Sequence, residues 1–236
     1  VIDFVLSNMA NAGMENIAVF VKNKSRSLVD HVSNGRPWDL NRKRYGLRIF
    51  NFGKEEPRHN DVKNFAENLD YFNISNQKYL ILAPSYMNYN IDFNEVAAFH
   101  EASGNDITML YKKVEDGEKN FKGCHVLSLN EDGRVLSVGR NLGDDKNINI
   151  GMEVYVMERK LFMSIVKNCV ETGHWRKVKN AIHDQLDRYK VGGYEFNGYL
   201  SCVNSLETYY RTNMDFLKTK VNTELFLGDR PIVTKS

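Results

Sequence analysis

The side chains best placed to do chemistry follow a short apolar run, residues 79–83 (YLILA), flanked by polar segments. A run of this length and composition is typical of a fully buried central strand in a mostly parallel sheet. Open α/β folds bind ligands in the crevice beyond the carboxyl ends of such strands. Pro84 ends the strand, which places Ser85 and Tyr86 at the mouth of that crevice. None of these three side chains is ionised at neutral pH, so this strand end offers no carboxylate to a metal ion.

Other ionisable groups could in principle supply the missing chemistry. Asp92, Glu153 and Glu195 could lie near the crevice and form a shifted metal site. We favour a helix-capping role for Asp92 and solvent-facing positions for both glutamates. The six histidines show no ligand spacing, and we expect them at the surface or in local hydrogen bonds. They are His31, His59, His100, His125, His174 and His183.

The cysteines indicate a reducing environment. Cys124, Cys169 and Cys202 are scattered and odd in number, with neither metal-ligand spacing nor a disulfide framework. Cys202 is expected to be a small buried apolar residue. A chain with this cysteine usage is predicted to be cytoplasmic.

Length and charge exclude several classes of partner. At 236 residues the chain suits one large α/β domain with a proper core. Its formal net charge of +2 gives no electrostatic case for binding nucleic acid or an anionic membrane. No apolar stretch approaches the ~20 residues that span a bilayer. We therefore predict neither a nucleic-acid nor a membrane partner.

Apolar runs alternate with amphipathic stripes along the chain, and this alternation predicts a three-layer α/β fold. The expected strands or extended segments are residues 17–21, 47–52, 79–83, 107–111, 151–157 and 194–203. The expected helices are residues 2–13, 26–34, 61–72, 93–103, 159–171, 176–189 and 205–217. Ser25 is placed to cap the second helix. Two alternating runs around Asp132 and Gly133 predict a β-hairpin.

Two separated motifs carry a family resemblance. The first consists of Ile2, Asp3, Phe4, Leu6, Ser7 and Asn8, and the second of Leu206, Glu207, Tyr209, Tyr210, Asn213, Met214 and Asp215. On both, and over nearly its whole length, the chain resembles the glucose-1-phosphate adenylyltransferases, the ADP-glucose pyrophosphorylases of glycogen synthesis. The resemblance implies a Rossmann-like nucleotide-diphospho-sugar transferase domain with a mostly parallel, mixed central sheet.

One loop is similar to a particular branch of that family. Pro37, Trp38, Asp39 and Leu40, followed by basic residues from Arg42, resemble the D-type subunit that Gram-positive bacteria pair with a catalytic subunit. By itself, the basic cluster of Arg42, Lys43 and Arg44 is more typical of a solvated loop. An anion-binding or subunit-contact loop is the alternative.

The departures from the active family concern its substrate and metal positions. The metal-binding Gly-Asp-His at the strand end is Pro84, Ser85 and Tyr86 here, and the second metal Asp is Cys202. The sugar-phosphate Glu-Lys-Pro has no counterpart in residues 135–142, and the Gly-rich nucleotide loop would precede Val1. Two further family motifs are altered in this chain. Gly151, Met152 and Glu153 stand in place of Ser-Met-Gly, and Asn60 and Asp61 stand at the start of the segment that is Gly-Thr-Ala-Asp in the family. We expect Pro84, Tyr86, Gly151, Met152, Glu153, Asn60 and Asp61 to be remnants of a substrate pocket.

These departures imply a degenerate subunit. Mg²⁺ requires hard anionic oxygens, which a Ser hydroxyl and a Cys thiol do not supply. We expect no catalytic residue and no metal or cofactor in this chain, with Mg²⁺ held only by a catalytic partner. The implied function is regulation of glucose-1-phosphate adenylyltransferase within a hetero-oligomer, with a sugar-phosphate or nucleotide effector. The alternatives are an active nucleotidyltransferase with an altered metal site, and a nucleotide- or sugar-phosphate-sensing module.

The resemblance also predicts a domain boundary near the end of the chain. Residues 1–229 would form the nucleotidyltransferase-like domain, without the strand that leads into the nucleotide loop. Residues 230–236 would begin a linker to a left-handed β-helix domain.

Overall fold

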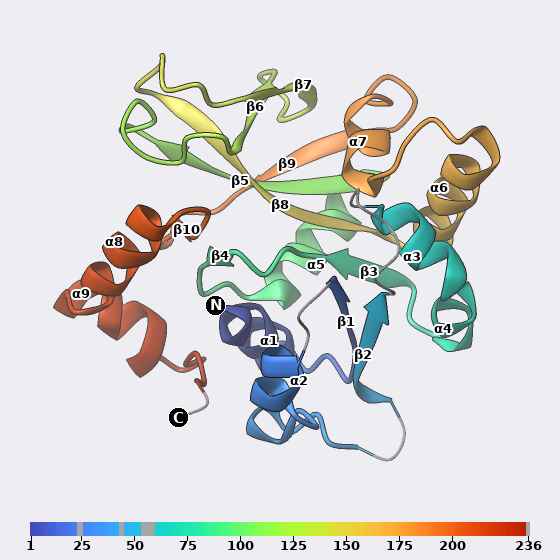
Figure 1. Ribbon diagram of the computed structural model, residues 1–236. Coiled ribbons are helices and arrows are strands. Elements are labelled where there is room, and N and C mark those ends of the chain that lie inside the picture. Colours follow the sequence, from blue (N-terminus) through green and yellow to red (C-terminus); the bar gives the residue numbers. More distant parts are fainter. Residues whose placement is uncertain (23–25, 43–44, 53–59, 235–236) are drawn as a thin grey trace.

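The computed structural model describes residues 1–22, 26–42, 45–52 and 60–234 (Figure 1). Its first half contains α1 (Ile2–Asn11), β1 (Asn16–Lys22), α2 (Arg26–Val32), a 3₁₀ turn (Arg36–Trp38), β2 (Gly46–Phe52), α3 (Asp61–Glu67), α4 (Leu69–Ile74), β3 (Tyr79–Leu82), β4 (Met87–Asn88) and α5 (Phe93–Ser103). The rest contains β5 (Ile107–Val114), β6 (His125–Leu129), β7 (Val135–Arg140), β8 (Ile148–Glu158), α6 (Arg159–Thr172), α7 (Val178–His183), β9 (Val191–Glu195), β10 (Ser201–Cys202), α8 (Leu206–Phe216), α9 (Thr219–Asn222) and a π-helical turn (Thr223–Leu227). The predicted cap Ser25 lies outside the described residues.

The large sheet is mixed, and its pairing differs from the mostly parallel expectation. Its strands follow the order β7-β6-β8-β5-β9, with β3 also paired to β8. β8 is antiparallel to β3, β5 and β6, whereas β5 and β9, like β1 and β2, pair in parallel. The physical reason lies in the connection from Val114 to Ile148, which carries the β6–β7 hairpin. Parallel neighbours usually need a crossover helix, and without one β8 returns beside β5 in the opposite direction.

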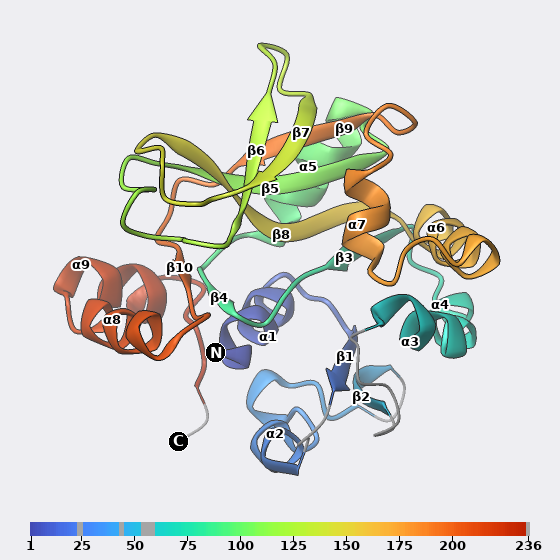
Figure 2. The same cartoon turned by 45° about the horizontal axis from the view of Figure 1, so that its top comes forward.

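The three-layer α/β class is confirmed by how the strands of this sheet divide their side chains. Along β8, Met152 and Val154 join one buried cluster, while Tyr155 and Met157 join another. Successive side chains of a strand point to opposite faces, so the two clusters cover the two faces of the sheet. The first cluster includes α5, and the second includes α3, α4, α6 and α7. In Figure 2, α5 lies behind the sheet and these four helices gather on its right side.

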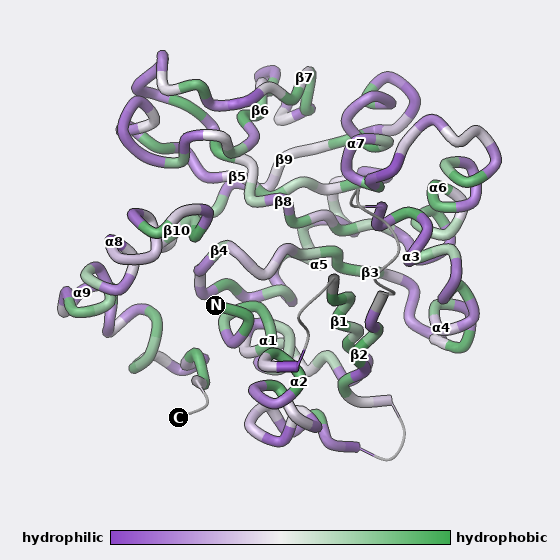
Figure 3. Tube along the Cα trace, in the orientation of Figure 1, coloured by the Kyte–Doolittle hydropathy of each residue, from purple (hydrophilic) through white to green (hydrophobic). Residues whose placement is uncertain are grey.

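Strand β3 forms where the apolar run predicted it, but its burial differs. All four of its residues are half-buried, so the prediction of a fully buried strand is wrong. β3 pairs with β8 along one edge, and its residues also line a cavity whose opposite wall is β1. Both strands are coloured as apolar in Figure 3, in contrast to the polar outer loops.

Two predicted helices are shorter than the pattern suggested. Residues 61–72 form α3 and α4, separated at Asn68, whose backbone φ is −118° and whose side chain donates to the Asn64 carbonyl at 2.9 Å. A local side-chain bond of this kind competes with the continuing helix. Of residues 176–189, only Val178–His183 form α7. The hairpin is confirmed, with Gly133 at φ 79° in the turn.

The loop is anchored in a core at Trp38, whereas Arg42 of the basic cluster is exposed. Trp38 is 5% exposed, and its indole N–H donates to the Ser7 hydroxyl at 3.0 Å. Arg42 pairs with Asp39 and Glu15, while Lys43 and Arg44 lie outside the described residues. Over the described ranges, no helix has both the length and the apolar character that crossing a bilayer requires.

Candidate functional site: a charged crevice beyond strand β3

The chain beyond β3 is held beside β10. The Val203 N–H donates to the Tyr86 carbonyl at 2.8 Å, and Met87 pairs with Cys202 in the short β4–β10 ladder. This pairing brings Ser85 and Cys202, 117 positions apart by their numbers, to the same region. Sequence reasoning placed both at one site, and the fold brings their segments together.

The chemistry of these two positions does not suit a magnesium ion. Ser85 is exposed and neutral, and Cys202 is buried with its Sγ 3.4 Å from Cys124 Sγ. That sulfur contact is the largest influence on both thiols, raising the pKa of Cys202 and lowering that of Cys124. Thiols are soft donors, whereas Mg²⁺ selects hard oxygens. Within the residues that the structure describes, no group of three or more His, Cys, Asp or Glu side chains could hold a metal ion.

Glu153 is the centre of a polar network that the sequence did not reveal. Its carboxylate accepts from Lys179 Nζ at 2.9 Å through both oxygens and from His125 Nδ1 at 2.7 Å. The Tyr86 hydroxyl also hydrogen-bonds to it. The Glu153 side chain is only 11% exposed. The expectation of a solvent-facing Glu153 is therefore wrong, because three donors from distant parts of the chain converge on its carboxylate.

Burial and hydrogen bonding set the protonation of this network. Burial is the largest influence on the pKa of Glu153 and would raise it, but the bonds from His125, Lys179 and Tyr86 outweigh it and hold the pKa at about 2. Burial, followed by the charges of His125 and Lys179, lowers the pKa of His183 to about 4. Burial, then Glu153, raises the pKa of Tyr86. At neutral pH the site holds an ionised carboxylate, a neutral His183 and a protonated Tyr86.

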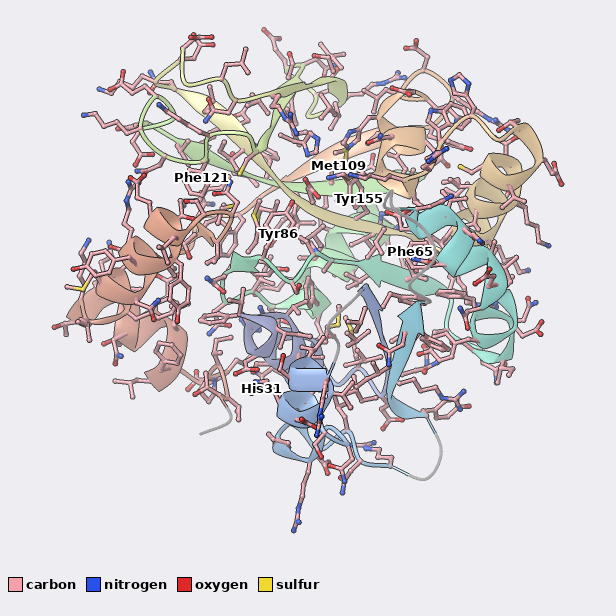
Figure 4. The ribbon with its side chains drawn as sticks, viewed as in Figure 1. His31, Phe65, Tyr86, Met109, Phe121 and Tyr155 are labelled. Carbon is pink, nitrogen blue, oxygen red and sulfur yellow. The ribbon has the colours of Figure 1, made fainter. Side chains whose placement is uncertain are left out.

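Two histidines take part in long-range contacts that their spacing did not indicate. His125 and His183 pack edge to face with ring centroids 5.0 Å apart, and a hydrogen bond of 2.9 Å joins His183 Nε2 to the Tyr155 hydroxyl. Tyr155 and Tyr86 are labelled near the middle of the molecule in Figure 4. Lys179 and His183 lie four positions apart on α7, but His125 lies on β6, and no sequence motif links that strand to the helix. His59, which we expect at the surface or in a local hydrogen bond, lies outside the described residues.

A cavity of about 1120 Å³ extends from this network between β1 and β3. Apolar side chains of both strands form much of its wall. The predicted pocket residues that line it are Pro84, Ser85, Tyr86, Glu153 and Asp61. Gly151, Met152 and Asn60 are not among its lining residues, and Met152 is fully buried in the core instead.

Asn60 and Asp61 have local structural contacts. Asn60 Oδ1 accepts from the Lys63 N–H at 3.0 Å and caps α3. Asp61 Oδ1 accepts from the Val178 N–H at 2.8 Å and so joins α3 to α7. Burial is the main reason that the pKa of Asp61 rises to about 6. These contacts account for both residues without a ligand.

The remaining two carboxylates have their own partners. Asp92 caps α5 by accepting from the Asn94 N–H at 2.9 Å, as expected, and also pairs with Arg230. Glu195 pairs with Lys113 at 2.7 Å and keeps a third of its side chain exposed.

Comparison with known proteins places the chain in a family. The sequence profile of the nucleotidyl transferase family matches residues 1–216. The chain belongs to this family. Two solved structures share the fold. HddC from Yersinia pseudotuberculosis has a TM-score of 0.64 and 14% identity, with 91% of this chain and 84% of that chain covered. A putative glucose-1-phosphate thymidylyltransferase from Bacillus anthracis has a TM-score of 0.67 and 11% identity, with 94% of this chain and 85% of that chain covered.

Among curated members of the nucleotidyl transferase family, the chain is similar to the glycogen biosynthesis protein GlgD. The Geobacillus stearothermophilus protein is 33% identical and the Bacillus subtilis protein 28% identical, each over 99% of this chain. The glucose-1-phosphate adenylyltransferase of Clostridium novyi is 28% identical over 96% of this chain. The chain spans 59% of the length of both GlgD proteins and 60% of the clostridial enzyme.

Proposed function

We propose that this chain is the nucleotidyltransferase-like part of a regulatory, catalytically degenerate subunit of glucose-1-phosphate adenylyltransferase. In this role it modulates ADP-glucose synthesis from ATP and glucose 1-phosphate for glycogen biosynthesis. The similarity to proteins named GlgD and to adenylyltransferases supports the pathway. The observation that carries the degenerate role is the pair of strand-end positions, where Ser85 is neutral and Cys202 is a buried thiol against Cys124.

The chemistry of nucleotidyl transfer explains why these two positions matter. The sugar phosphate attacks the α-phosphorus of ATP, and metal ions neutralise the charge that builds on the phosphoryl oxygens. Carboxylates would have to hold those ions. The neighbouring carboxylate of Glu153 is already engaged by Lys179 and His125, which disfavours an active enzyme with a shifted metal site. We propose that Mg²⁺ binds only in the catalytic partner.

The partner in this proposal is a catalytic adenylyltransferase subunit, associated in the cytoplasm. One described surface has the character of a protein contact: α8 and its end expose large apolar side chains. They are Leu206, Tyr209, Tyr210, Met214 and Leu217, with Leu206 83% exposed and Leu217 77% exposed. The linker after residue 229 and the β-helix domain beyond it stay predictions.

The experiment measures ADP-glucose formation by the full-length protein alone, by a catalytic subunit alone and by their mixture. We expect no measurable turnover alone and a changed kcat, KM or effector response of the catalytic subunit in the mixture. Association is followed by co-purification, with and without Leu206→Asp. Unchanged kinetics together with demonstrated absence of association would refute the regulatory role.

Restoring the carboxylates tests the proposed cause of inactivity. In the full-length protein, Ser85→Asp combined with Cys202→Asp should leave turnover more than about tenfold (~1.4 kcal/mol) below that of a catalytic subunit. The reason is that the sugar-phosphate lysine and the nucleotide-contacting segment are also altered. Recovery to within tenfold would show instead that the two metal positions were the main loss.

A further inference from the structure

Glu153 lies in an unusual backbone conformation inside the longest strand of the sheet. Its φ is 54°, in the left-handed region, and it is the one described non-glycine residue with positive φ that lies within a strand. The pairing between β5 and β8 explains this conformation. Met109 pairs with Tyr155 and Tyr111 pairs with Gly151, so β8 has extra residues opposite Leu110. Such a bulge redirects a side chain away from the regular pleat. Here the redirected side chain belongs to Glu153, which lines the cavity.

The groups that meet the Glu153 carboxylate form a donor set typical of phosphate recognition. Lys179 supplies an ammonium from α7, His125 an imidazole N–H from β6, and Tyr86 a hydroxyl from the segment after β3. The Lys179 and His125 side chains are 24% and 19% exposed, so solvent screens them only in part. Charge-assisted donors that converge on one point from three elements bind carboxylate and phosphate oxygens alike.

We propose that Lys179, His125 and Tyr86 form an anion site and that the Glu153 carboxylate occupies it, which keeps phosphate monoesters out of the cavity. The ligand class that this site would take is a phosphate group, free or esterified to a sugar. The proposal concerns binding by this chain alone and does not require a partner or turnover. It goes beyond the regulatory role, because it assigns the closing of the pocket to one side chain.

Three observations favour a self-occupied anion site over an ordinary ion pair. Glu153 reaches its partners from a strained backbone at a bulge, whereas an ion pair for stability needs no strain. Two of the three donors, Lys179 and Tyr86, line the cavity together with Glu153, so an anion could reach them from that side. The ammonium of Lys179 contacts both oxygens of the carboxylate, as it would two oxygens of a phosphate.

The test is phosphate binding by Glu153→Gly, measured by isothermal titration of inorganic phosphate at pH 7. Glycine accepts φ 54° without strain, so the variant removes the carboxylate and relaxes the backbone together. We expect Glu153→Gly to bind phosphate at least about tenfold more tightly than the unmodified chain. Adding Lys179→Met should abolish that gain. The matched control is Glu195→Gln on β9. This substitution breaks the ion pair with Lys113, which lies away from the cavity, and it should leave phosphate binding unchanged.

A second variant keeps the proposal open to refutation if Glu153→Gly does not fold. Glu153→Gln retains the size of the side chain and removes its charge, so phosphate binding should still exceed that of the unmodified chain. The proposal is overturned if the folded variants bind phosphate no better than the unmodified chain. It is equally overturned if the gain survives Lys179→Met, because the phosphate would then be bound elsewhere.

Discussion

Replacing Asp61 with asparagine should stabilise the protein much more at neutral pH than in mild acid. Asp61 begins α3 and accepts from the Val178 N–H at 2.8 Å. Burial is the largest influence on its pKa, which rises from the ordinary 3.8 to about 6 against the lowering effect of the Val178 bond. Asparagine keeps an acceptor oxygen for Val178 and cannot ionise. The substitution therefore removes the cost of a partly buried negative charge.

The sign and size of this stability change follow from the pKa of Asp61 in the folded protein. A raised pKa means that the folded state binds the proton more tightly. The contribution to stability is therefore complete below pH 3.8 and is lost as the pH rises through about 6. The pKa difference between the folded and unfolded states corresponds to at most about 3 kcal/mol in the free energy of unfolding. Partial exposure of the Asp61 side chain reduces this value to about 2 kcal/mol. For a chain of this length, that equals a melting temperature about 4–8 °C higher for Asp61→Asn at pH 7.5.

Urea unfolding of the unmodified protein and of Asp61→Asn, at pH 4.5 and 7.5 and constant ionic strength, measures the effect. We expect the stabilisation by Asp61→Asn to be several times larger at pH 7.5 than at pH 4.5. Asp144→Asn, in an exposed loop, is the matched control and should change stability by less than about 0.5 kcal/mol at either pH. The reasoning is refuted if Asp61→Asn destabilises the protein at pH 7.5, or if its effect is the same at both pH values.

Three further substitutions address the core. Ser7→Ala removes the acceptor of the Trp38 indole N–H and should lower the free energy of unfolding by about 1–3 kcal/mol, whereas an unchanged urea midpoint would contradict that role. Gly193→Ala would place a Cβ 2.4 Å from the Leu129 side chain, and we expect a destabilisation of about 1–3 kcal/mol by thermal unfolding. Phe65→Ala, in a buried aromatic cluster, should cost about 3–5 kcal/mol in urea unfolding, with Phe65→Leu as the milder control. Equal effects of Phe65→Ala and Phe65→Leu would argue against close packing of the Phe65 ring.

Local features of the fold could be predicted because they depend on residues close in sequence. Helix α5 spans the predicted residues 93–103, with Asp92 at its start and Gly104 at φ 62° after its end. The hairpin around Gly133 likewise follows from turn chemistry. The interruption at Asn68 was missed, since the apolar stripe continues across it and only the side-chain bond to Asn64 reveals the break.

By itself, the sequence determined the alternation of strands and helices, the family, and the lack of carboxylates at Ser85 and Cys202, because these are properties of residue type and spacing. Only the tertiary structure decided the antiparallel course of β8 and the partial burial of β3. It also decided that His125, Glu153 and Lys179 meet at one point. His125 and Lys179 lie 28 and 26 positions from Glu153 on either side and share no motif with it, so their meeting depends on how β6, β8 and α7 pack together. The charge of a side chain can be read from the sequence, but the partner that neutralises it depends on packing between distant elements.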